Sequence, residues 1–232
     1  MDVNHPRQIK SFVLRQGRLT KGQEQALETA WPQYGIAEAQ GLLNFSAIFT
    51  NTAPISLEIG FGNGESLAQM ARAAPERNFL GIEVHTPGVG HLLHLVQKYQ
   101  LENVRVMNTD AVDIIQQRIP VGSLDRIQIY FPDPWHKKRH HKRRIIQAEF
   151  VSLLATRLQE GGLLHLATDW QDYAQAMAEV LQASPDFYTM NPNGEPFSPR
   201  PDFRPLTKFE QRGLRLGHGV WDLLYCKRNV GV

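Results

Sequence analysis

Short apolar strands alternate with amphipathic helices through the middle of the chain, and this alternation constrains the fold more than any other feature. Apolar patterns predict strands at 55–59, 79–84, 104–108, 126–131 and 163–167. Amphipathic patterns between and after them predict helices at 66–74, 90–100, 111–118, 144–158 and 170–183. Strands joined by helices of this length are typical of βαβ units, which build a parallel sheet with helices on both faces.

Both ends of the chain depart from this alternation. Two further strands, at 187–190 and 220–227, follow without an ordinary crossover helix between them, so we expect an antiparallel strand near the C-terminus. At the other end, Thr20 and Gln23 have capping-box spacing for a helix that should stop at Pro32. We therefore expect a helical N-terminal extension, residues 1–50, that packs on or over a main domain of residues 51–232.

Composition excludes some classes of protein. At 232 residues the chain is long enough for one domain that folds without disulfides or metal. Its one cysteine, Cys226, cannot form an intrachain disulfide, which favours a reducing compartment. No apolar run approaches the roughly 20 residues of a membrane span, and the first residues lack the apolar core of a signal peptide. We expect a cytoplasmic protein that does not contact membranes.

A glycine turn follows the first predicted strand. Gly60, Gly62 and Gly64 stand where the strand should turn sharply into a helix, which lets a ligand approach the backbone closely. Many such turns contain glycines and bind nothing, so the turn alone is weak evidence. The spacing G-x-G-x-G also differs from the G-x-G-x-x-G of dinucleotide sites.

Acidic residues accompany this turn. Glu58 precedes the glycines, Glu83 ends the second predicted strand, and Asp110 ends the third. The carboxyl ends of parallel strands line the crevice where open α/β sheets bind ligands. Each acid alone is explained equally well as a helix N-cap or turn residue. Together they favour S-adenosylmethionine, because its sulfonium and ammonium groups suit an acidic site.

A rigid corner ends the fourth predicted strand. Asp133 lies between Pro132 and Pro134, which restrict the backbone around it. Pro-Asp-Pro is also good chemistry for an ordinary β-turn. The position favours function, because this strand end borders the predicted crevice and Phe131 and Trp135 offer aromatic faces for stacking a base.

A run of basic residues follows the corner directly. Residues 136–144 contain six lysines and arginines, three histidines and no acid. Such runs are often solvated loops or localisation signals, but one that begins beside a candidate catalytic acid favours nucleic-acid binding. Residues 136–144 contain no cysteine or acid that could complete a metal site with His136, His140 and His141, so we expect no metal.

Several segments together resemble a known family. LEIGFGNGESL, GIEVHTPGVG, IYFPDPWHKKRHHKRR, ATDW and TKFE, in this order, are similar to the bacterial tRNA (guanine-N7-)-methyltransferases. The resemblance runs from about residue 12 to residue 225. It implies a class I, Rossmann-like methyltransferase fold with a doubly wound, mostly parallel seven-stranded sheet. It also implies methyl transfer from S-adenosylmethionine to N7 of guanosine 46 in the variable loop of tRNA.

The resemblance and the motifs give three sets of site residues. The cofactor set is Glu58, Gly60, Gly62, Gly64, Glu83, Asp110 and Asp133, and Asp133 is also the expected catalytic residue. The substrate set is Lys137, Asp169, Thr207, Lys208, Phe209 and Glu210. The RNA-binding set is Arg139, His140, His141, Lys142, Arg143 and Arg144.

Alternatives remain open at this point. Thr207 and Glu210 also have capping-box spacing, and Asp169 could be an N-cap. An RNA-binding module with a vestigial cofactor pocket is the main rival function, and a nicotinamide oxidoreductase is disfavoured by the glycine spacing. The sequence leaves open whether Asp133 acts chemically or only positions the base. Besides tRNA, no obligatory protein partner is evident.

Overall fold

A computed structural model describes residues 11–12, 17–207, 210 and 219–229 of the chain. Its strands are Ile55–Ile59 (β1), Asn78–Ile82 (β2), Val104–Met107 (β3), Leu124–Tyr130 (β4), Leu158–Thr168 (β5), Phe187–Thr189 (β6) and Trp221–Lys227 (β7). They form one sheet in the order β3-β2-β1-β4-β5-β7-β6. The first five strands are parallel, and β7 is antiparallel to β5 and β6. The predicted mostly parallel sheet with an antiparallel strand near the C-terminus is confirmed.

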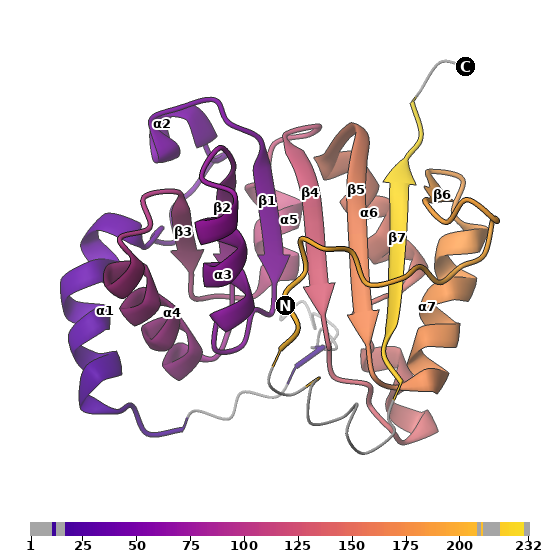
Figure 1. The fold of residues 1–232 in the computed structure, drawn as a ribbon, viewed down its shortest axis with the longest axis horizontal. Coiled ribbons are helices and arrows are strands. Elements are labelled where there is room, and N and C mark those ends of the chain that lie inside the picture. The colour runs from indigo at the N-terminus through magenta and orange to yellow at the C-terminus, as the bar shows by residue number, and fades with distance from the viewer. Residues whose placement is uncertain (1–10, 13–16, 208–209, 211–218, 230–232) are drawn as a thin grey trace, which may run out of the picture.

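Helices cover both faces of this sheet (Figure 1). They are Lys21–Tyr34 (α1), Phe45–Phe49 (α2), Glu65–Ala73 (α3), Thr86–Tyr99 (α4), Ala111–Gln117 (α5), Ala148–Arg157 (α6) and Gln171–Ala183 (α7). In Figure 1, α3 and α4 lie in front of the sheet, whereas α5 and α6 lie behind it. From the N-terminal segment, α1 packs on α4 and buries Ala26 and Ala30. Among the described residues, no helix combines the length and apolar character that crossing a membrane requires.

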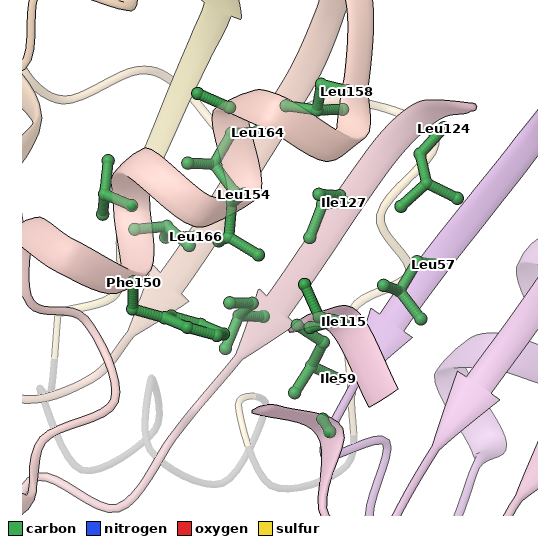
Figure 2. Close-up of a cluster of buried hydrophobic side chains, with 14 of the residues drawn as sticks. Leu57, Ile59, Ile115, Leu124, Ile127, Phe150, Leu154, Leu158, Leu164 and Leu166 are labelled. Carbon is green, nitrogen blue, oxygen red and sulfur yellow. The ribbon is translucent and has the colours of Figure 1, made fainter. Parts of the chain in front are cut away.

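The larger hydrophobic cluster joins one face of the sheet to α5, α6 and α7. Figure 2 shows Leu57 and Ile127 of the central strands packed with Ile115 of α5 and Leu154 of α6. These four side chains are fully buried. Burial of side chains of this size contributes roughly 1.5–3 kcal/mol each, so this layer fixes the central strands rigidly.

The strand order reverses between β1 and β4. In the chain β1 leads to β2 on one side, while β4 and β5 extend the sheet on the other. Loops that follow β1 and β4 therefore diverge, which leaves a crevice at the carboxyl ends of these two strands. The glycine turn and the Asp133 corner are the two loops concerned, so the topology brings both motifs to one edge.

The basic run differs from its predicted secondary structure. The helix expected at 144–158 begins at Ala148, and Lys138–Arg143 form a short 3₁₀-helix, η1. Like charges at neighbouring positions disfavour a regular α-helix, and the run has no apolar side chains that could pack it on the sheet. The run is therefore a turn of its own, separate from α6.

Other boundaries also differ. The helix expected at 90–100 begins at Thr86, with Pro87 in its first turn, where proline is tolerated. The strand expected at 163–167 begins at Leu158, because β5 continues through a register shift opposite Leu124 despite its two glycines. The first helix continues through Pro32 to Tyr34. Pro32 lies in the last turn, so the loss of its backbone donor disturbs only the end of the helix.

Candidate active site

Two adjoining cavities form one groove at the switch point. One has a volume of about 200 Å³ and is lined mainly by residues that end or follow β1, β2, β3 and β4, with Ser11 and Phe12 from the N-terminal segment. The other has a volume of about 380 Å³ and is lined by the glycine turn and by Thr207. Gly60, Tyr130 and Phe131 line both cavities, so the two adjoin, and together they are here called the groove.

The glycine turn leaves room for a ligand at two of its three glycines. Gly60 has φ of 70° and Gly62 has φ of 57°, a region that favours glycine. A Cβ atom added at either would meet no atom within 4 Å and would extend into open space. At Gly64 a Cβ would lie 2.6 Å from Leu92, so this glycine allows α3 to pack on α4. The backbone at Gly60 and Gly62 is open to a bound molecule.

Glu58 is a buried acid at the end of the groove that the glycine turn lines. It belongs to β1 and is 2% exposed. Its Oε2 atom accepts no hydrogen bond from the residues that the structure describes. Burial, together with the neighbouring charge of Glu83, raises the pKa of Glu58 to about 8. A cationic group placed at Oε2 would satisfy this atom and favour the ionised form.

Glu83 and Asp110 line the smaller cavity and also hold the backbone around it. The Oε2 atom of Glu83 accepts a hydrogen bond from the Gly62 amide at 2.8 Å, and Oε1 accepts from the Val84 and His85 amides. A carboxylate has about four lone-pair sites, so Oε2 can accept one further donor. Asp110 caps α5, with Oδ1 accepting from the Val112 amide at 3.1 Å. The N-cap explanation therefore holds for Asp110, which still lines the groove.

The Asp133 corner has an unusual backbone. Phe131 and Trp135 have φ of 50° and 47°, in the left-handed region that non-glycine residues rarely adopt. Each such residue costs on the order of 1–3 kcal/mol and is typical of binding and catalytic loops. Asp133 lies exposed between them, lines the smaller cavity, and its Oδ1 accepts from the Trp135 amide at 3.0 Å. The strained corner thus holds this carboxylate at the groove.

Trp135 is less available than the sequence indicated, and another aromatic pair stands nearby. The Arg143 guanidinium lies 3.7 Å from the centroid of the Trp135 ring, and Trp135 Nε1 donates to the Ser11 carbonyl. Instead, the rings of His136 and Trp170 meet edge to face at 4.3 Å. Trp170 is 40% exposed and follows Asp169 after β5. This pair joins the two loops that carry Asp133 and Asp169.

Residues 137–144 are here called the basic turn. The 3₁₀ spacing places their side chains on different sides of η1. Side chains three residues apart share one side of such a helix. His140 and Arg143 both lie against Trp135. His141 and Arg144 both face Asp172 of α7, with Arg144 Nη2 at 2.5 Å from its Oδ2. A third side of η1 carries exposed Arg139 and Lys142, and Lys137 and Lys138 are exposed at its start.

Arg144 therefore differs from the expectation of a surface cation. It is 5% exposed, its Nε donates to the Pro134 carbonyl at 2.9 Å, and its guanidinium lies over the Tyr173 ring. It links the Asp133 corner to α7. Partial desolvation and the surrounding cations lower the pKa of His140, so this residue is neutral at pH 7. The exposed positive charge of the basic turn comes mainly from Lys137, Lys138, Arg139 and Lys142.

Thr207 and Glu210 form both bonds of a capping box. The Glu210 amide donates to Thr207 Oγ1 at 3.1 Å, and the Thr207 amide donates to Glu210 Oε2 at 3.4 Å. Thr207 lines the groove, whereas Glu210 is buried in an ion pair with Arg204. Lys208 and Phe209 lie outside the described residues.

Two features of the groove suit S-adenosylmethionine. The open glycine backbone leaves space, and the buried Glu58 oxygen lacks a partner among the described residues. Sequence reasoning missed Tyr130, Trp170 and the N-terminal residues Ser11 and Phe12 as parts of this site. Trp170 could have been found, since it belongs to the ATDW segment, but no pattern connects residues 11–12 to the groove.

Comparison with known proteins agrees with this architecture. The family model described as "Putative methyltransferase" matches residues 52–223. The chain is 55% identical over 221 residues to a tRNA (guanine-N(7)-)-methyltransferase of Hydrogenovibrio crunogenus, covering 95% of this chain and 92% of that one. It is 56% identical over 223 residues to the protein of the same name from Alcanivorax borkumensis, covering 96% and 92%.

A solved structure supports the fold. The 16S rRNA methyltransferase KamB shares 14% identity with a TM-score of 0.56, covering 84% of this chain and 99% of that one. Identity this low speaks to the fold alone, which is that of a class I methyltransferase. The family match and the two relatives cover most of the chain. The residues expected to bind the cofactor and Thr207 line the groove, whereas Lys137, Asp169 and residues 139–144 do not. The chain therefore belongs to the tRNA (guanine-N7-)-methyltransferase family.

Proposed function

We propose that this enzyme transfers a methyl group from S-adenosylmethionine to N7 of guanosine 46 in the variable loop of tRNA. One observation carries the proposal: a single loop, residues 131–144, contributes both to the groove and to the exposed cations. Lys142 and Arg143 line a further cavity of about 410 Å³ that shares Ser11, Asp110 and Ile145 with the groove. A phosphate chain on the basic turn would therefore run beside the groove.

The two ends of the methyl donor would lie in different cavities. Glu58 and the glycine turn suit the charged amino-acid end, and Glu83 and Asp110 suit the hydroxyls and base of the nucleoside. S-adenosylmethionine, when bound, supplies a methyl group on a sulfonium that a nucleophile can attack. The open backbone at Gly60 and Gly62 supports this arrangement, as does the Glu58 oxygen that has no partner in the described part of the chain.

The protein's task at the base is orientation and charge stabilisation. Guanine N7 has a lone pair and no proton, so attack at that atom needs no general base. A carboxylate from Asp133 or Asp169 can accept hydrogen bonds from guanine N1–H and N2–H, which adenine does not offer in the same pattern. Such an acceptor would also stabilise the positive charge that methylation adds to the purine. The exposed Trp170 ring offers a surface for stacking.

Methyl transfer to defined tRNA tests the proposal. Unmodified tRNA is incubated with the protein and a methyl-labelled donor, and the labelled nucleoside is identified and mapped. A matched tRNA with adenosine at position 46 is the control. We expect 7-methylguanosine at position 46 and no label in the control. Label at another nucleoside or position, or no label in either RNA, would contradict the proposal.

A further inference from the structure

A segment after β6 crosses one face of the sheet. Residues 198–207, here called the strap, run in front of β7, β5 and β4 in Figure 1. The Ser198 amide donates to the Asp222 carbonyl of β7 at 2.9 Å. The Phe203 ring meets His165 of β5 edge to face at 5.5 Å, and Arg126 of β4 lies 3.9 Å over its face. The strap is thus held at each strand that it crosses.

One buried cation anchors the end of the strap. Arg204 is 1% exposed and donates from Nε and Nη2 to the two carboxylate oxygens of Asp222, both at 2.8 Å. It also donates from Nη1 and Nη2 to the two oxygens of Glu210, both at 2.7 Å. Both acids are buried. Planar two-point pairing of this kind fixes direction as well as distance, which a lysine cannot reproduce.

Asp222 connects Arg204 to Tyr130, a residue that lines the groove. His165 Nε2 lies 2.7 Å from Asp222 Oδ1, and His165 Nδ1 lies 2.8 Å from the Tyr130 hydroxyl. Burial lowers the pKa of His165, so the neutral ring donates from Nε2 and accepts at Nδ1. The Tyr130 hydroxyl also accepts from Gln128 Nε2 at 2.7 Å. A continuous chain of hydrogen bonds therefore runs from Arg204 to Tyr130, which lines both cavities.

Thr207 stands at the other end of the anchored unit. Its side chain caps Glu210, which Arg204 holds, and Thr207 itself lines the part of the groove that contains Glu58. A buried group of charges is a poor source of stability, because desolvation offsets much of the attraction. It does fix geometry, since a shift of Glu210, and of Thr207 with it, would break a paired charge. The arrangement is better explained by placement of Thr207 than by stability.

We propose that Arg204 is a positioning residue for methyl transfer: through Glu210 and Asp222 it holds Thr207 at the part of the groove that Glu58 and the glycine turn line. Thr207, placed there, would hold the target base against the donor. This inference rests on the proposed function, because it assigns Arg204 to the same reaction. Arg204 touches neither substrate; it acts through the two acids.

Arg204→Lys tests the positioning role. Lysine keeps the charge but cannot make a planar two-point pair with either carboxylate, so Thr207 should lose its fixed placement. We expect kcat for tRNA methylation to fall about 100-fold, the size of effect that a misplacement of about 1 Å can cause. Affinity for S-adenosylmethionine, measured by calorimetry, should stay within about threefold of wild type, since Glu58 and the glycine turn are untouched.

Arg118→Lys is the matched control. Arg118 is also buried, but it donates to the Ala37 and Gly41 carbonyls and lines neither cavity. Melting temperatures are measured for both variants. The proposal is overturned when Arg204→Lys keeps the wild-type kcat, or when its kcat falls only as far as that of an equally destabilised Arg118→Lys protein.

Glu210→Gln tests the same positioning role if Arg204→Lys does not fold. It preserves size and one acceptor oxygen but removes a charge from the pair, so kcat should fall by a smaller factor with donor affinity kept. An unchanged kcat in this variant would also overturn the proposal. Wild-type protein is assayed in parallel on the same tRNA. Absence of methylation by wild type refutes the proposed function, whereas active wild type with fully active variants refutes only the role of Arg204.

Discussion

The acids of the groove and the cations of the basic turn differ in how tightly the protein holds them. Glu58 is 2% exposed and Glu83 is tied to three backbone amides, whereas four of the six lysines and arginines of the basic turn are exposed. A small cationic ligand needs a fixed acid in a desolvated site, because attraction is strong there. A flexible phosphate chain needs only accessible charge. Charge alone therefore does not identify function, because the exposure of a charge decides which partner it can bind.

Asp133 stands where the two regions meet, so its loss should have the largest effect. Asp133→Asn keeps the Oδ1 acceptor for the Trp135 amide but removes the negative charge. We expect the single-turnover rate of methylation to fall about 100- to 1000-fold. Affinity for tRNA should remain within about threefold, since phosphate contacts supply most of it. A near-normal rate would remove Asp133 from the reaction.

The buried acid predicts a proton linked to donor binding. Because the pKa of Glu58 is about 8 in the free protein, a cationic donor at pH 7 must displace its proton. Affinity for S-adenosylmethionine should therefore rise up to about tenfold per pH unit from pH 6 to pH 8. Calorimetry in buffers of different ionisation enthalpy should detect release of about one proton at pH 7. A pH-independent affinity would contradict this assignment.

Glu58→Gln tests the link between this proton and donor binding directly. We expect donor affinity at pH 8 to fall about 10- to 100-fold, because a charged hydrogen bond is lost, and its dependence on pH to disappear. Stability should change in the opposite direction. The unfolded chain releases this proton near the ordinary pKa of 4.5, whereas the folded protein keeps it until about pH 8. Stability therefore falls as pH rises from 4.5 to 8, and glutamine avoids that loss. At pH 8 the variant should melt at a higher temperature than wild type; a lower one would indicate a packing defect.

The exposed side of the basic turn should govern the salt dependence of tRNA binding. Arg139→Ala with Lys142→Ala removes two available cations, so the slope of log affinity against log salt should become shallower by about 1.4 to 1.8. Donor affinity should not change. The matched control is Arg72→Ala with Lys98→Ala, two exposed cations beside Tyr99 on α3 and α4. An equal loss in the control would show that only net charge matters.

Arg144 should behave differently from its neighbours, with a smaller effect on function. Its guanidinium holds Asp172 and the Pro134 carbonyl, so Arg144→Ala should cost about 2 kcal/mol of unfolding free energy. For a chain of this length that corresponds to a melting temperature lower by about 4–8 °C. The salt dependence of tRNA binding should stay as in wild type. A shallower slope with an unchanged melting temperature would place Arg144 on the RNA instead.

Local patterns were enough to predict the sheet and the groove. The strand Ile55–Ile59 has the bounds that its apolar run predicted, and the glycines and acids that follow the strands meet at one edge. These features depend on neighbouring residues and on the general rule for ligand sites in open sheets. The sequence could not show which cations of residues 137–144 are exposed. Their exposure depends on contacts with Trp135 and with Asp172, which lies 28 residues beyond Arg144.

The strap shows where sequence reasoning ends. Arg204 stands in a proline-rich segment without periodicity, and its partner Asp222 lies 18 residues away. His165 pairs with the same acid across 57 residues. Only tertiary structure brings such groups together, and no local propensity marks them. Glu210 illustrates the consequence, because its motif suggested a substrate contact while its carboxylate is committed to Arg204.

Photo-crosslinking from the target nucleotide tests most directly that one loop serves both regions. A tRNA with a photoreactive guanosine at position 46 is irradiated with the protein in the presence of S-adenosylmethionine, and the attached peptide is sequenced. We predict attachment within 131–139 or at Thr207, because these residues border the groove beside the basic turn. Attachment to the outer face of α1 or α4, with residues 131–139 unmodified, would contradict the account.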